Sequence, residues 1–385
     1  MFFDEQRLGH LLQEREADGL LALTPSNIFY LTGFAKSGGA AAFVSGGSSN
    51  HPRLVVPSSN IDFIIEDVSE RVQVVAYGRF PRALAEDESW DTNERRIADL
   101  HRGARTEASR DSVLVSILRD FRGTLLCDLD RDGTALTAAF DGIDIRSDPG
   151  AFKWLRMVKD AEESGRLRVA AEVTEAAIEA VAAACEEGVA QETLTRAFCT
   201  SLAGSGAQLR LVHISVGRSG AFGNANVPGD RLGTGNTVKL DVGAVVAGYA
   251  SDVARCFSLG APSGKARAYY DALVAGQEAA FELLHPGTRA CDVFDRAVEA
   301  VRSHGIPHYD RTNVGHGIGV DGDGYDPPLL GPADETLLEA GMVLCIETPY
   351  YEIGFGGLQV EDMVLVTDDG IDSLTVSARD MWSIG

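Results

Sequence analysis

The chain has 385 residues, 45% hydrophobic and 24% charged, which is ordinary globular composition and long enough for two domains. Its 34 basic and 57 acidic residues give a formal net charge of -23, so neither nucleic acid nor an anionic membrane is an expected partner. No segment reads as a signal peptide or reaches the roughly 18 apolar residues of a membrane span, and the six cysteines include no C-x-x-C pair. We therefore expect a cytoplasmic protein with reduced thiols.

The first 150 residues alternate between helix and strand patterns. Residues 19–34, GLLALTPSNIFYLTGF, predict a strand, a Thr-Pro-Ser break and a short helix. Elsewhere in this region, apolar spacing predicts helices over 7–19 and 112–121, and apolar runs predict strands over 40–46, 52–57, 72–78 and 123–129. This part contains no dense cluster of metal-ligand residues, so we expect an α/β domain that carries no metal.

The residue pattern changes near residue 150. There, Asp148 and Pro149 precede a long Ala/Glu/Arg-rich stretch that is predicted to be helical and ends at Gly188. We place a domain boundary there, giving domains of residues 1–150 and 151–385. The second domain continues with a predicted helix over 191–206, a strand over 208–217, a Gly/Asn-rich loop over 218–230, and helices over 263–284 and 290–304.

Two carboxylates interrupt an apolar strand pair at residues 238–259. Asp241 and Asp252 stand where a strand favours apolar side chains. A turn centred between Val246 and Ala247 would place the two aspartates directly opposite each other. Like charges in that position destabilise a sheet, so a cation between them is expected.

A second strand pair, residues 342–366, repeats this arrangement. Glu347 and Glu361 are symmetric about Gly354, which predicts a second facing pair of carboxylates. A single acid of this kind could equally be a solvated charge on an edge strand. Two symmetric pairs in apolar surroundings favour a binding site.

His316 lies between glycines in GHGIGVDGDGYDPP, residues 315–328, so its neighbours leave room for close approach. A lone histidine is usually structural, but four carboxylates and one imidazole form an oxygen-rich ligand set. Such a set suits Mn²⁺, Co²⁺, Fe²⁺ or Zn²⁺. Since one divalent ion cannot balance four carboxylates, we expect two ions, the usual arrangement for metal-assisted hydrolysis.

These residues resemble the pita-bread metallohydrolases, which include Xaa-Pro aminopeptidases, prolidases, methionine aminopeptidases and the metal-free creatinases. LTPSNIFYLTGF and LRMVKDAEE also resemble segments of the prolidase and creatinase branch, so the resemblance covers nearly the whole chain. The stretches that match around the ligands are KLDVGA with Asp241, YASDVAR with Asp252, GHGIGV with His316, CIETP with Glu347 and LQVEDMVLV with Glu361.

The resemblance implies an α/β N-terminal domain, an α+β pita-bread catalytic domain and a homodimer. It implies that Asp252, His316 and Glu361 hold one metal and Asp241 the other, with Asp252 and Glu361 bridging. Glu347 would bind a metal and act as general acid/base while a metal-activated water attacks the carbonyl. Mn²⁺ is the expected metal, with Co²⁺, Zn²⁺ and Fe²⁺ as alternatives.

The chain departs from the family pattern at residues expected to handle protons and substrate. Tyr325 stands where the peptidases carry a second histidine, so we assign it to catalysis and substrate binding. The loop before Asp241 contains Asn226 in place of a histidine, and Gln359 stands where an arginine is common; both are expected to bind substrate. His213 is expected to replace a lost imidazole, although a structural strand histidine is the alternative.

We therefore expect a dinuclear-metal hydrolase of a peptide or amide C–N bond, similar to Xaa-Pro aminopeptidases and dipeptidases and acting on a small peptide or small amide. One alternative is a specialised hydrolase of a non-peptide amide or cyclic amidine, similar to ectoine hydrolase. A metal-free creatinase-like enzyme and a non-catalytic binding module are further alternatives, which the retained ligands disfavour.

Overall fold

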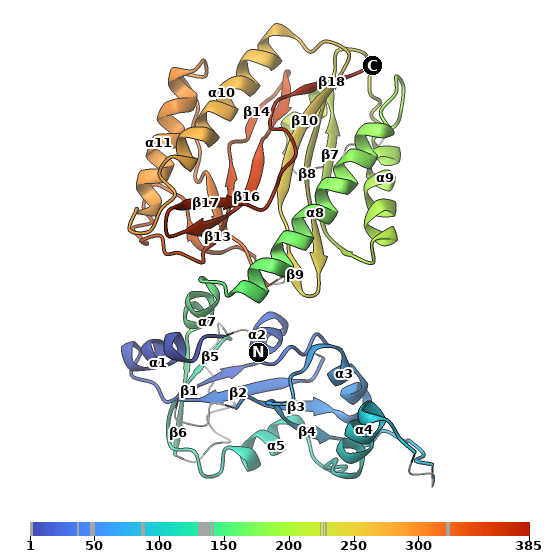
Figure 1. The fold of residues 1–385 in the computed structure, drawn as a ribbon, viewed down its shortest axis with the longest axis vertical. Helices are drawn as coiled ribbons and strands as arrows, with labels where there is room; N and C mark the ends of the chain where they lie inside the picture. The colour runs from blue at the N-terminus through green and yellow to red at the C-terminus, as the bar shows by residue number, and fades with distance from the viewer. Residues whose placement is uncertain are drawn as a thin grey trace. The chain divides into compact units, whose positions relative to one another are not determined.

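The computed structural model describes residues 3–36, 38–46, 51–85, 89–129, 140, 142–223, 225, 227, 229–320 and 324–385. The chain divides into two compact units, Met1–Arg156 and Met157–Gly385 (Figure 1). None of the helices in the described part is long and apolar enough to cross a membrane.

The first unit is built on a mixed six-stranded sheet of order β4-β3-β2-β1-β5-β6. Strand β1 pairs antiparallel with β2 and parallel with β5. The elements are α1 (Glu5–Glu14), β1 (Gly19–Ala22), α2 (Pro25–Thr32), β2 (Ala41–Ser45), β3 (Arg53–Pro57), η1 (Ser58–Phe63), α3 (Ile64–Asp67), β4 (Gln73–Tyr77), α4 (Thr92–Arg102), α5 (Arg110–Ile117), β5 (Gly123–Cys127), β6 (Ile143–Ser147) and α7 (Pro149–Arg156). The predicted helices and strands of this region are confirmed, whereas α4 and β6 were not predicted.

The second unit contains a ten-stranded sheet whose main path runs β12-β11-β13-β16-β10-β8-β7. Helices α8 and α9 pack beside β8 and β7, and α10 and α11 pack against each other, with α10 also contacting β13 (Figure 1). The helices are α8 (Ala161–Ala183), α9 (Gln191–Gly204), η2 (Gly217–Phe222), α10 (Gly264–Phe281) and α11 (Ala290–Ser303). The strands are β7 (Gln208–Val216), β8 (Thr237–Val246), β9 (Tyr249–Ala250), β10 (Val253–Leu259), β11 (Gly315–Gly317), β12 (Asp326–Leu329), β13 (Val343–Glu347), β14 (Tyr350–Glu352), β15 (Gly356–Leu358), β16 (Glu361–Thr367), β17 (Gly370–Ser373) and β18 (Trp382–Ile384).

The expected pairing of Asp241 with Asp252 is wrong. Val246 pairs with Tyr249 around a two-residue turn, Ala247–Gly248, so the turn is centred one residue later than expected. Both turn residues have positive φ, 47° and 80°, as in the type I′ turns that match strand twist. This shift places Asp241 opposite Ala254, while Asp252 lies just before β10.

The expected pairing of Glu347 with Glu361 is confirmed. The two residues are direct partners in the antiparallel ladder between β13 and β16. Beyond them the chain continues as the separate β14–β15 pair, in which Tyr350 faces Leu358. The symmetry about Gly354 therefore holds through both pairs of strands.

Helix α10 fixes the backbone on both sides of Glu347. The buried amide of Gln277 donates to the carbonyl of Ile346 at 2.9 Å, and the Thr348 hydroxyl donates to the carbonyl of Leu273 at 2.9 Å. At Gly276, a Cβ atom would lie 2.2 Å from Val301 Cγ2 on α11. This glycine therefore lets α10 and α11 approach each other closely.

Gly276→Ala should lower the free energy of unfolding by up to about 2 kcal/mol. The helix-propensity gain of about 1 kcal/mol is outweighed by overpacking that costs about 1–3 kcal/mol, because β-branched Val301 cannot easily turn away. Urea unfolding measures the change. The matched control is Gly165→Ala in α8, where the added methyl meets nothing within 4 Å and should stabilise the protein. Stabilisation by both substitutions would contradict the close approach at Gly276.

Candidate metal centre

Strand register places a row of functional side chains across one face of the second sheet. His213 pairs with Asp241, Asp241 with Ala254, Ala254 with Glu361, and Glu361 with Glu347. Directly opposed residues of antiparallel strands project to the same face, so all of these side chains share it. The small methyl group of Ala254 leaves space between Asp241 and Glu361.

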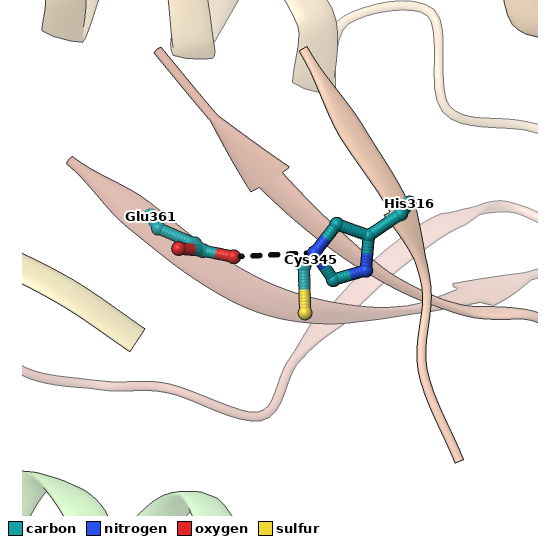
Figure 2. A group of neighbouring side chains, drawn as sticks. All are labelled: His316, Cys345 and Glu361. Carbon is teal, nitrogen blue, oxygen red and sulfur yellow. Dashed lines mark ion pairs between the residues drawn. The ribbon is translucent and has the colours of Figure 1, made fainter. Parts of the chain in front are cut away.

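A second row runs beside the first. His316 pairs with Cys345, and Cys345 pairs with Met363, whose sulfur accepts a hydrogen bond from the backbone N–H of Asp252 at 3.4 Å. His316 Nε2 lies 3.7 Å from Asp252 Oδ2 and 3.8 Å from Glu361 Oε1. Figure 2 shows His316, Cys345 and Glu361 pointing toward one another from their strands. The two rows thus meet at Glu361.

The structure brings together all five predicted metal-ligand residues. Donor atoms of Asp241, Asp252 and Glu361 lie within 4.8 Å of one another. His316 reaches Asp252 and Glu361 as described above. The Gln359 amide donates to both Glu347 Oε2 and Glu361 Oε2, each at 3.3 Å, which ties Glu347 to the same group.

His316 is oriented as a neutral ligand. Its Nδ1 lies 3.0 Å from the Gly317 carbonyl oxygen, so the ring proton is held there and the Nε2 lone pair faces the carboxylates. Burial lowers the pKa of His316 to about 4, so the imidazole is neutral at pH 7. The glycine context noted in the sequence has a structural reason, since a Cβ at Gly317 would lie 2.3 Å from the Pro327 carbonyl oxygen.

The carboxylates are costly to ionise where they lie. Burial, reinforced by the other carboxylates, raises the pKa of Asp241 and of Glu361. Burial likewise raises the pKa of Asp252, and it raises that of Glu347 to about 7. Positive charge is therefore required beside them at neutral pH.

Two basic side chains supply part of that charge. Arg210 Nη1 donates to Asp252 Oδ2 at 2.6 Å, and Lys239 Nζ lies 3.7 Å from Asp241 Oδ2. Within the described residues, Asp252 Oδ1 and Glu361 Oε1 are buried and accept no hydrogen bond. Buried carboxylate oxygens without donors, beside an oriented imidazole, fit divalent cations of the hard or borderline type.

Gln359 occupies the centre of a hydrogen-bond network. Its Oε1 accepts from Lys239 Nζ and from the Tyr351 hydroxyl, each at 3.2 Å, while its Nε2 donates to the two glutamates. These contacts use the full capacity of the amide. Substrate binding by Gln359 stays a prediction, and the contacts favour a role in positioning Glu347 and Glu361.

Of the other predicted site residues, Tyr325 stacks on His316, with ring centroids 3.8 Å apart and an interplanar angle of 20°. Burial, reinforced by the nearby Glu347 and Asp252, raises the pKa of Tyr325 to about 12. His213 lies beside Asp241, and its Nδ1 is buried with no hydrogen-bond partner among the described residues. Asn226 lies outside the described residues.

Cys345, Lys239 and Arg210 were missed by the sequence analysis. Each stands in a strand and was interpreted as part of an apolar or alternating run. The signal that could have found Cys345 and Lys239 is position, because each lies two residues before a predicted ligand, Glu347 or Asp241, and so on the same face of its strand.

Residues 165–368 match the model of metallopeptidase family M24, and residues 6–98 match the creatinase/prolidase N-terminal domain. The chain belongs to metallopeptidase family M24. The expected family and the expected fold class, an α/β N-terminal domain with a pita-bread catalytic domain, are confirmed. Membership also confirms a metal-dependent hydrolase of C–N bonds, and it implies divalent metal ions.

Relatives and solved structures agree with this assignment. The chain is 25% identical over 378 residues to an Xaa-Pro dipeptidase of Pyrococcus furiosus, covering 98% of each chain. It is 31% identical over 228 residues to a putative dipeptidase of Bacillus subtilis, covering 59% of this chain and 62% of that one. The fold matches an Xaa-Pro dipeptidase from Bacillus anthracis with a TM-score of 0.81 at 20% identity, covering 98% of each chain. It also matches an X-Pro aminopeptidase from Thermotoga maritima with a TM-score of 0.79 at 19% identity, covering 99% of each.

Lys239→Met should destabilise the metal-free protein by about 3 kcal/mol, because it leaves the Asp241 carboxylate without its neighbouring cation. The loss should be smaller in saturating Mn²⁺, since bound ions would supply the missing charge. Urea unfolding in chelator and in Mn²⁺ measures both values.

The matched control is Lys265→Met, which removes a half-exposed partner of Glu352. It should cost about 0–1 kcal/mol under both conditions. An equal loss for Lys239→Met with and without metal would contradict the charge-compensating role.

Proposed function

We propose that the chain is a dinuclear peptidase that cleaves the Xaa-Pro bond of small peptides, with Mn²⁺ as the preferred metal. The observation that carries the proposal is the convergence of four carboxylates, three buried and one partly buried, and one oriented, neutral imidazole on a single sheet face. The names of the Pyrococcus and Bacillus anthracis proteins support Xaa-Pro dipeptides as substrates. They favour this reading over a non-peptide amide or cyclic amidine hydrolase.

The proposed metal ligands are Asp241, Asp252, His316, Glu347 and Glu361. When bound, two divalent ions supply an acidified water and polarise the scissile carbonyl. The oxygen-rich donor set supports Mn²⁺ over softer ions, and the charge of four carboxylates supports two ions over one.

Glu347 is proposed as the general acid/base. It takes the proton from the attacking water and returns it to the departing amine, a role worth about 10²–10⁴-fold in rate. The Gln359 amide and the hydrogen bonds from α10 hold the residue in place. Tyr325, stacked on His316, is proposed to donate its hydroxyl proton in a hydrogen bond to the developing oxyanion. His213 is proposed as a catalytic residue, and Asn226 is proposed to bind substrate.

A pocket of about 670 Å³ supports a dipeptide-sized substrate. Its lining includes Arg311, Pro349 and Tyr351, and Tyr351 hydrogen-bonds to Gln359, so the pocket adjoins the carboxylates. The Arg311 guanidinium lies over the Tyr351 ring at 5.9 Å, and its charge offsets part of the rise that burial causes in the pKa of Glu347. It forms no salt bridge with any carboxylate in the described part of the chain. Arg311 is therefore available for the free carboxylate of a dipeptide.

The proposal includes a cytoplasmic homodimer with residues 1–150 as the N-terminal domain and 151–385 as the catalytic domain. The family resemblance supports the homodimer and this division into domains. Size-exclusion chromatography with light scattering tests the oligomeric state.

The first test is the metal content of the purified protein, together with turnover of Xaa-Pro dipeptides and small amides in Mn²⁺, Co²⁺ or Zn²⁺. We expect two ions per chain and cleavage of the dipeptides. Glu347→Gln should lower kcat by about 10²–10⁴-fold. Activity on amides alone would replace the peptidase proposal with the amide hydrolase, and full activity after exhaustive metal removal would refute both.

Arg311→Gln should lower kcat/KM for an Xaa-Pro dipeptide by about ten- to hundredfold, because a charge-assisted hydrogen bond to the substrate carboxylate is lost. The loss should be small for the corresponding Xaa-Pro amide, which lacks that charge. Lys265→Gln is the matched control, since Lys265 lines the same pocket but already pairs with Glu352 at 2.6 Å. Equal losses on both substrates would contradict carboxylate recognition by Arg311.

A further inference from the structure

We propose that His316, Cys345 and Glu361 form an alternative, inhibitory metal site, overlapping the catalytic centre, that takes a single thiophilic divalent ion such as Zn²⁺ or Cd²⁺. The inference rests on the proposed function, because His316 and Glu361 are also proposed ligands of the catalytic ions. A thiophilic ion bound through Cys345 would withdraw both residues from the catalytic centre. The chain would then be active with Mn²⁺ and inhibited by soft metals at the same location.

The sheet places the sulfur beside the imidazole. Cys345 on β13 is the direct partner of His316 on β11, so both side chains project to the same face. Donor atoms of His316, Cys345 and Glu361 lie within 4.8 Å of one another, and Figure 2 shows the three side chains converging. Ligand bonds of about 2.0–2.3 Å require slightly closer donors, which small side-chain rotations can supply.

Few hydrogen bonds compete with a metal ion for the lone pairs of these three side chains. The Cys345 thiol makes only a long contact, 3.9 Å, to the Asp252 carbonyl oxygen. Glu361 is 2% exposed, and its Oε1 has no hydrogen-bond partner in the described part of the chain. His316 is 1% exposed and keeps its proton on Nδ1, which leaves Nε2 free to bind a metal.

The chemistry of this group differs from that of the carboxylate cluster. A nitrogen, a sulfur and an oxygen donor suit Zn²⁺, Co²⁺ or Cd²⁺, whereas Mn²⁺ prefers oxygen. Binding replaces the S–H bond with a metal–sulfur bond, and the proton leaves to solvent without any change of oxidation state. Because the three side chains are buried, the ion would be held mainly by protein donors.

The neighbouring sulfur atoms do not share this arrangement. Met363, opposite Cys345, already accepts a hydrogen bond from the Asp252 backbone. Cys256 is equally buried, but its sulfur accepts from the Gln359 backbone N–H at 3.3 Å, and it belongs to neither ligand group of the described residues. Cys256 is therefore the matched control for Cys345.

The decisive experiment is a Co²⁺ titration of metal-stripped protein, monitored by near-ultraviolet absorption. A sulfur-to-cobalt charge-transfer band should appear in the wild type, persist in Cys256→Ser and vanish in Cys345→Ser. Serine keeps a small polar side chain at this position and alanine removes it, and a thermal unfolding scan of Cys345→Ser and Cys345→Ala checks that loss of the band is not loss of fold. A band unchanged in both Cys345 variants, or absent from the wild type, would overturn the site.

A second experiment measures how Cd²⁺ and Zn²⁺ inhibit the Mn²⁺-loaded protein. The activity of each variant is expressed relative to its own activity without inhibitor. Cys345→Ser should need at least about tenfold more ion for half-inhibition than the wild type or Cys256→Ser. Identical inhibition of all three would overturn the inhibitory role. If no metal gives peptidase activity, the proposed function fails, while the cobalt band still decides the thiol site.

Discussion

Four carboxylates on one buried sheet face repel one another, and the rest of the second unit accommodates that repulsion. Each lies where burial favours its neutral form, yet the two basic side chains in the group, Lys239 and Arg210, contribute only part of the compensating charge. The remaining negative charge makes the apo site unfavourable and cation binding favourable. Stability and metal affinity are therefore coupled, because the same charges determine both.

Contacts outside the carboxylate group hold the strands that carry it in place. Glu361 and Asp362 are adjacent and project to opposite faces of β16, so one faces the metal centre and the other faces away. Asp362 accepts from the fully buried Arg255 at 2.6 Å, and the same guanidinium donates to the Glu361 carbonyl at 2.7 Å. A buried ion pair on one face thereby fixes the backbone that presents the carboxylate on the other.

The sequence predicted the glutamate pair but not the register of the aspartates. Glu347 and Glu361 could be paired from symmetry about a glycine, whereas the other turn uses Ala247 at φ 47°, a residue that does not signal positive φ. Because the turn is centred one residue later than expected, the partner of Asp241 is residue 254 instead of residue 252. This change of partner has a chemical consequence. Asp252 joins the row of His316 instead of facing Asp241, so the carboxylates and the imidazole form two adjacent rows. Lys239 and Cys345 were interpreted as core residues, although each lies two residues before a predicted ligand and therefore on the same face of its strand.

Gln359 and Lys239 together explain how the centre tolerates the loss of an arginine that is common in the family it resembles. A guanidinium at position 359 would supply both charge and hydrogen bonds from one side chain. Here the amide of Gln359 supplies the hydrogen bonds to Glu347 and Glu361, and the ammonium of Lys239 on β8 supplies the charge. Lys239 is 1% exposed, so its charge acts through a medium of low dielectric and stays effective from the neighbouring strand. The carboxylates thus have a cation and two hydrogen-bond donors beside them, supplied by two side chains instead of one.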